Sequence, residues 1–222
     1  MPDIRQSPEW EFYERHFATS RMQPYLVEHR GDKRLAIDLY AWNMDVSAAF
    51  WELLGYLEIA LRNRIDERMT ASTGSEKPHW IFHFENQSRK RNQMMTKELG
   101  KARERILRNS KTPTSQRMIS ELPFGFWVTL LSKRYRNLWP NLAAGFPGMP
   151  SRNPNDLFCK AASMRDLRNR IGHHHRIWTL ELREKHDELL SIAGYIDAEF
   201  GEWLTSTSRI PGLLRTRPSH RR

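Results

Sequence analysis

The sequence predicts an all-α fold with long connecting loops, and three observations support this fold class. Apolar residues recur three and four positions apart in most segments, as on a buried helix face, and do not alternate as in a half-buried strand. Residues that commonly start helices precede several of these segments. Strand patterns are scarce. With 222 residues, of which 39% are hydrophobic, the chain is long enough for one sizeable core.

The first half of the chain predicts two helical regions followed by an irregular segment. Ser7-Pro8-Glu9 is typical of a helix start, so a short helix is expected from there to Phe17. Residues 33–70 are densely apolar without alternation, which predicts one long helix or two in succession. Residues 71–87 include Gly74 among polar and aromatic residues and are expected to be an irregular connection.

Residues 88–111 form the most basic interior segment, with nine Lys and Arg against only Glu98 and Glu104. A helix here presents positive charge on several sides, as expected of a segment that follows an RNA backbone. The alternative is a solvated helix face with no binding role. The candidate RNA-binding residues in this segment are Lys97, Lys101 and Arg105.

The second half predicts three helices. Residues 122–139 are apolar at helical spacing and precede a loop rich in Pro and Gly. Asn153-Pro154 is a favourable helix start. Residues 179–203 predict one amphipathic helix. We expect a single helical domain over residues 1–206. Residues 207–222 contain five arginines and no acid, and a flexible basic tail is expected there.

Charge and composition narrow the class of protein. The net charge of +10 and the pI near 10.0 favour polyanionic partners, although a basic protein without a nucleic-acid role is the alternative. The single Cys159 allows no internal disulfide and is expected in the core. The N-terminus lacks a signal-peptide pattern, and no segment fits a membrane span. A cytoplasmic protein is therefore expected.

Neither a metal nor a cofactor is expected. His79 and His83 have the spacing of two metal ligands on a helix, but no nearby acid or cysteine completes a set. The sequence also lacks the Gly-rich loop of a P-loop NTPase.

Residues 165–176 combine arginines with three successive histidines on a predicted helix, and they are the clearest candidates for chemistry. Histidine exchanges protons near neutral pH, while arginine holds a phosphate without losing its charge. Together they suit RNA cleavage, because the neighbouring 2′-hydroxyl supplies the nucleophile and no metal is strictly required. The expected products are a 2′,3′-cyclic phosphate and a 5′-hydroxyl, and DNA is expected to be inert. The candidate catalytic residues are Arg168, Asn169 and His173.

Helix geometry makes this assignment more specific. On an ideal helix Asn169 and His173 share a face, whereas Arg168 lies about 140° from His173. The long Arg168 side chain must therefore extend around the helix to approach His173. Gly172 weakens the helix beside His173. One histidine cannot be base and acid at the same time, so a second copy of the motif from another protomer is expected. The bare spacing of Arg, four residues and His also occurs at Arg170–His175 and Arg215–His220, so the spacing alone is weak evidence.

The segment 167–174, Leu-Arg-Asn-Arg-Ile-Gly-His-His, resembles the Arg-polar-x-x-x-His motif of HEPN ribonucleases and, more narrowly, the Abi-like abortive-infection family of AbiD/AbiF type. The resemblance extends to Tyr25-Leu26, Leu39-Tyr40-x-Trp42-Asn43, residues 57–63 and Pro123-Phe124-Gly125-Phe126-Trp127. His175-Arg176 departs from it, because an acidic residue is usual there, and this affects the expected position of His174.

The resemblance implies a HEPN-like helical bundle with additional helices and metal-independent RNA cleavage by the Arg and His pair. It also implies a bacterial phage-defence or toxin role, a homodimer with facing motifs and, in some members, association with a small regulatory RNA. The family is similar to the RNA-cleaving effectors of type VI CRISPR systems. Arg170 and His174, which lie within the motif, are candidate RNA-binding residues.

An internal repeat adds two candidates. The pentapeptide Leu-Arg-Asn-Arg-Ile occurs at 61–65 and again at 167–171, but the first copy lacks the histidine. Arg62 and Asn63 are therefore candidate RNA-binding residues of a degenerate half-site, with Glu58 orienting them. Chance or a repeated packing requirement explains the repeat equally well.

Two rival functions remain open from the sequence. The main one is a non-catalytic protein that holds a small RNA or a partner through its basic helices. The other is a helical interaction protein in which Trp10, Trp42 and Trp51 contact partners.

Overall fold

The computed structural model describes residues 9–73, 78–85 and 93–219, and the all-α prediction is confirmed there. These residues form helices and connecting turns, with no strand among them. No helix in these ranges is long and apolar enough to cross a membrane.

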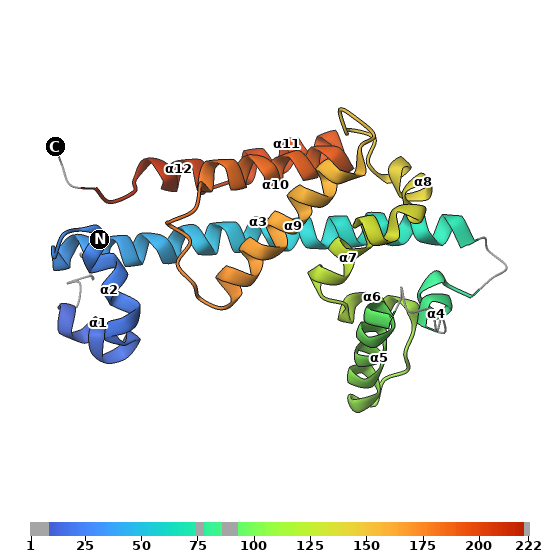
Figure 1. Ribbon diagram of the computed structural model, residues 1–222, viewed down its shortest axis with the longest axis horizontal. Helices are drawn as coiled ribbons and strands as arrows, with labels where there is room; N and C mark the ends of the chain where they lie inside the picture. Colours follow the sequence, from blue (N-terminus) through green and yellow to red (C-terminus); the bar gives the residue numbers. More distant parts are fainter. Residues whose placement is uncertain (1–8, 74–77, 86–92, 220–222) are drawn as a thin grey trace.

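The longest element, α3 (Lys33–Thr73), is one unbroken helix of 41 residues, which settles the choice between one helix and two. At 1.5 Å per residue it is about 60 Å long and forms the axis of the elongated molecule (Figure 1). Its inward face is apolar along most of its length, and Leu39, Leu57 and Leu61 are fully buried.

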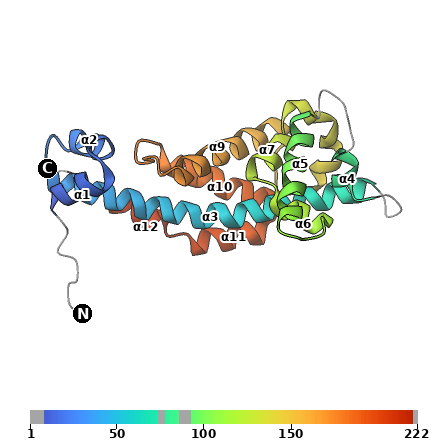
Figure 2. The same cartoon turned by 90° about the horizontal axis from the view of Figure 1, so that it is seen from below.

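Two short helices, α1 (Trp10–Phe17) and α2 (Thr19–Glu28), pack at the N-terminal end of α3 (Figures 1 and 2). Glu9 stands at the N-cap position of α1, and the predicted cap at Ser7-Pro8 lies outside the described residues. Ala18 joins the two helices with φ 67°, a conformation that L-residues rarely adopt. The sequence did not predict α2.

The opposite end of α3 carries shorter elements. The expected irregular connection contains α4 (Trp80–Glu85), and the basic segment forms α5 (Gln93–Arg108), followed by α6 (Ser115–Glu121). The single helix expected over 122–139 is instead α7 (Phe124–Leu130) followed by the 3-10 helix η2 (Lys133–Leu138). The expected loop contains α8 (Trp139–Leu142) and η3 (Ala143–Gly145).

The C-terminal helices lie along α3. Helix α9 (Pro154–Gly172) crosses it, and α10 (Leu182–Ile196) and α11 (Ala198–Thr207) form a hairpin (Figures 1 and 2). The prediction of one helix over 179–203 is wrong, because Asp197 is extended and caps α11 by accepting a hydrogen bond from the Phe200 N–H at 2.9 Å. A Cβ on Gly201 would lie 3.0 Å from the Gly194 backbone, so a larger residue there fits only if the two helices move apart by a few tenths of an ångström.

The expected flexible tail is wrong for the residues that form α12 (Ile210–Arg215). Ile210 is fully buried, and the Trp42 Nε1–H donates to the Leu213 carbonyl at 2.7 Å. Beyond the helix, the Arg217 guanidinium lies over the rings of Trp42 and Trp178, and it pairs with Glu28 at 3.3 Å. These contacts order the segment although it is rich in arginine.

Candidate functional site

Helix α9 carries the candidate motif and begins as the sequence predicts. The Asn153 side chain accepts a hydrogen bond from the Asn155 N–H at 3.1 Å, and Pro154 occupies the first helical position. The helix ends at Gly172, with His173 as its C-cap. The three histidines expected on the helix therefore follow its last residue, which corrects the prediction.

Residues 173–176, here called the histidine turn, end the helix in a Schellman motif. The His174 N–H donates to the Ile171 carbonyl at 2.9 Å, and the His175 N–H donates to the Arg170 carbonyl at 2.8 Å. His174 takes the left-handed conformation, with φ 55°. A left-handed conformation at a non-glycine residue costs about 1–2 kcal/mol, so the surrounding contacts must hold the turn in place.

Two distant side chains hold the histidine turn. The Arg21 guanidinium of α2 donates to the His174 carbonyl at 2.6 Å. The buried amide oxygen of Asn43 in α3 accepts from the N–H groups of Ile177 and Trp178 at 2.9 and 3.2 Å. The turn is thus fixed to α2 at its centre and to α3 just after its end.

The crossing of α3 and α9 positions Arg168. Its Nε lies 3.8 Å from a carboxylate oxygen of Glu58, and its guanidinium lies over the Trp51 ring, 5.2 Å from the centroid. The same Trp51 ring lies 3.6 Å from where a Cβ on Gly172 would be. One indole therefore lies against both the Arg168 guanidinium and the last turn of α9.

Glu58 is the acidic group of this crossing. Burial raises the pKa of its carboxyl, while the positive charges of Arg168 and Arg62 and the Phe124 backbone act in the opposite direction. Arg62 is half-buried, and its Nε has no hydrogen-bond partner in the described part of the chain. The structure thus brings the first arginine of each pentapeptide copy, Arg62 and Arg168, near one carboxylate.

Asn169 and His173 are both exposed. The His173 N–H donates to the Asn169 carbonyl at 3.0 Å, so the two residues follow one another on the same side of the last turn. The His173 and His175 rings are 6.0 Å apart between centroids. The imidazole of His173 is therefore open to solvent, with a second imidazole beside it.

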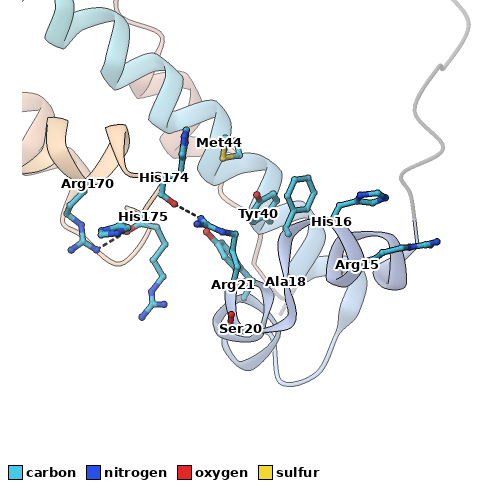
Figure 3. A pocket seen from close by; sticks show the side chains of 13 residues that line it. Arg15, His16, Ala18, Ser20, Arg21, Tyr40, Met44, Arg170, His174 and His175 are labelled. Carbon is cyan, nitrogen blue, oxygen red and sulfur yellow. Dashed lines mark hydrogen bonds between the residues drawn. The ribbon is translucent and has the colours of Figure 1, made fainter.

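An open groove of about 990 Å³ lies between the histidine turn and the α1–α2 pair (Figure 3). The motif side contributes Arg170, His174, His175 and Arg176. A smaller hollow of about 370 Å³ lies on the other side of the turn, against α3, and is lined mainly by apolar atoms of residues such as Met44 and Trp51. His174 and His175 line both spaces, so the turn forms the wall between them.

The family model described as Abi-like protein matches residues 10–179. The chain belongs to the Abi-like protein family. The match runs from the start of α1 to just beyond the histidine turn, so it includes both walls of the groove and the crossing of α3 and α9. Membership of the Abi-like family points to abortive infection, a form of phage defence. No curated protein and no solved structure matches the chain.

The basic helix α5 of this Abi-like protein lies apart from the histidine turn, near the other end of α3, in both views (Figures 1 and 2). Lys97 is exposed, and Lys101 pairs with Glu98 at 2.7 Å. Arg105 binds the side chain and the carbonyl of Glu121, at 3.0 and 2.6 Å. Arg105 therefore joins α5 to α6, and the structure does not bring these three candidates to the motif.

The two pentapeptide copies of the Abi-like chain share a packing role. The Leu and Ile of each copy are buried: Leu61 and Ile65 in α3, and Leu167 and Ile171 in α9. This favours the packing explanation of the repeat. Asn63, the remaining half-site candidate, is exposed on α3.

The isolated histidine pair and the cysteine have ordinary environments in the Abi-like structure. His79 Nε2 lies 3.1 Å from the Thr70 hydroxyl and 3.4 Å from the Asp66 carboxylate. Within the described ranges, no group of three or more His, Cys, Asp or Glu residues is arranged to hold a metal ion. Cys159 is exposed, which corrects the expectation that it lies in the core.

Sequence reasoning missed the residues that organise the Abi-like site from a distance. Asn43 gave a usable signal, because it is a polar residue among the apolar positions of α3. Of the three tryptophans that are candidate partner contacts, Trp51 is 45% exposed, whereas Trp10 and Trp42 are buried. Arg21 gave no signal, because its role depends on α2 packing near the histidine turn.

Proposed function

We propose that this Abi-like protein is a metal-independent endoribonuclease of HEPN type that acts in phage defence by abortive infection or as a toxin. One observation carries the proposal. An exposed His173 ends the helix on which Arg168 is held by Glu58 and Trp51. A proton-exchanging group and a permanent cation near one helix end support the proposal, because cleavage of an RNA phosphodiester requires both.

The proposed reaction uses the nucleophile of the substrate. The 2′-oxygen attacks the adjacent phosphorus, the bond from phosphorus to the 5′-oxygen breaks, and the products are a 2′,3′-cyclic phosphate and a 5′-hydroxyl. The 2′-hydroxyl loses a proton, and the leaving oxygen gains one. His173 exchanges one of these protons, while Arg168 offsets the negative charge that develops on the phosphate oxygens. Asn169 is exposed beside them and orients the phosphate.

The second proton transfer requires another group. A single imidazole cannot serve as base and acid in one step, so we propose a homodimer in which the motifs of two protomers face each other. The exposure of Asn169 and His173 leaves them accessible to such a partner.

The test is incubation of the purified protein with labelled RNA and matched DNA in EDTA, followed by end-group analysis. RNA cleavage with 2′,3′-cyclic phosphate ends is expected, together with loss of cleavage in His173→Ala at an unchanged circular dichroism spectrum. Cleavage of DNA, or an absolute requirement for magnesium, contradicts the mechanism.

A second candidate function is non-catalytic binding of RNA, including a small regulatory RNA. The basic groove beside the histidine turn favours it. RNA binding by the wild-type protein without cleavage in any condition would establish this alternative.

A further inference from the structure

The groove beside the histidine turn is positively charged on both walls. Arg15 and Arg21 come from α1 and α2, and Arg170 and Arg176 come from the end of α9 and the turn. Arg15, Arg21 and Arg176 are exposed. Arg170 donates through Nη2 to the Arg176 carbonyl at 2.9 Å, and its buried Nε has no hydrogen-bond partner among the described residues. Among the residues that the structure describes, no carboxylate lines the groove. Opposing arginines with no acid between them attract a chain of phosphates.

Aromatic rings form part of the same surface. Phe17 is 38% exposed, and its ring lies 5.3 Å from that of Tyr40. Tyr40 is held by further ring contacts with Tyr13 and Tyr25, at 6.0 and 5.2 Å. The result is a fixed aromatic platform with an open face at Phe17. An unpaired base stacks on such a platform, whereas a base inside a duplex has no free face.

The groove adjoins the candidate catalytic group. His174 and His175 line it (Figure 3). The His175 ring is 6.0 Å from the His173 ring. If one phosphate of a polynucleotide lies at His173, the neighbouring part of the strand reaches the groove, because only the width of one side chain separates His173 from it. The volume of about 990 Å³ is at the upper end of the range for small-molecule sites, and the groove is open, as a strand passing through requires.

We propose that this groove binds single-stranded RNA on one side of the cleaved phosphodiester, with arginines on both walls holding phosphates and Phe17 stacking on a base. The inference rests on the proposed function for the identity of the cleaved bond, but binding itself can be measured without cleavage. It assigns the ligand-binding role to Arg15, Phe17 and Arg176, which the sequence motif does not include.

The experiment measures binding of a short labelled RNA to His173→Ala protein by fluorescence anisotropy in EDTA, over a series of salt concentrations. The double variant Arg15→Glu/Arg176→Glu is compared with Lys133→Glu/Arg134→Glu, an equal charge change at exposed positions of η2. The groove variant is expected to raise Kd at least about tenfold. It is also expected to reduce the slope of log Kd against log salt concentration by about 1.4, the value for two lost single-strand phosphate contacts. Equal effects of the two double variants overturn the proposal.

The stacking part is tested with Phe17→Leu, which keeps an apolar side chain and removes the ring. For single-stranded RNA the Kd is expected to rise on the order of tenfold. For a duplex of the same sequence binding is expected to be weaker and insensitive to this change. Duplex binding as tight as single-strand binding, or no effect of Phe17→Leu, shows general attraction of polyanions and overturns the assignment.

The two proposals fail separately. Groove-dependent RNA binding without cleavage by the wild type keeps this inference and refutes the nuclease. Cleavage by the wild type with binding that is unaffected by Arg15→Glu/Arg176→Glu keeps the nuclease and refutes the groove. Unchanged circular dichroism and thermal unfolding of each variant confirm that the measured losses are losses of binding.

Discussion

Substitution of Asn43 by Ala is expected to destabilise the protein strongly, because one amide oxygen satisfies two buried backbone groups. The side chain is 3% exposed and accepts the N–H groups of Ile177 and Trp178 at 2.9 and 3.2 Å. An unsatisfied buried donor costs about 1–3 kcal/mol, so two give about 2–6 kcal/mol. Asn43 also borders the smaller hollow, where water can reach part of the site. We therefore expect a loss of about 2–4 kcal/mol.

The measurement is the free energy of unfolding from urea titrations followed by circular dichroism. Ser47→Ala is the matched control, because Ser47 lies one helical turn further along α3, is 8% exposed and borders the same hollow. The control is expected to change stability by less than about 0.5 kcal/mol. If Asn43→Ala also changes it by less than that, the two hydrogen bonds do not anchor the histidine turn.

Three further predictions follow from local contacts. Asp197→Ala removes the cap of α11 and is expected to cost about 1 kcal/mol of unfolding free energy in urea titrations, whereas Asp197→Asn keeps most of it. Burial lowers the pKa of His186 below 6.5, so the unfolded chain binds more protons than the folded protein. The free energy of unfolding is therefore expected to fall as the pH drops through 6.5. A His186→Asn protein with the same acid dependence contradicts this. Burial raises the pKa of Glu58 above 4.5. The wild type is therefore expected to lose unfolding free energy relative to Glu58→Gln as the pH rises from 4.5 through the raised pKa. A difference in unfolding free energy between the two proteins that stays constant with pH refutes this prediction.

The elements that the sequence predicted are those whose signals are local. The start of α9 follows from Asn153 and Pro154, which act within one turn, and α3 follows from an apolar pattern that persists for many turns. The candidate residues Arg168 and His173 were found in the same way, from one short segment. Their chemical roles remain proposals.

The features that the sequence did not predict depend on contacts between distant segments. The apolar spacing continues across Asp197, because α10 and α11 both bury a face although the chain reverses between them. The order of α12 depends on Trp42, which is 171 residues away from its hydrogen-bond partner Leu213. The contact of Arg168 with Trp51 likewise requires the crossing of α3 and α9, which no local pattern specifies.

The unbroken course of α3 gives this protein a mechanical property. Tyr40 at the groove, Asn43 below the histidine turn, and Trp51, Glu58 and Arg62 at the crossing all belong to this one rod. From Tyr40 to Arg62 the rod measures about 33 Å, at 1.5 Å per residue. If the groove binds a strand as proposed, a shift of the groove end of α3 is expected to pass along this helix to the crossing, and so to change the placement of Arg168.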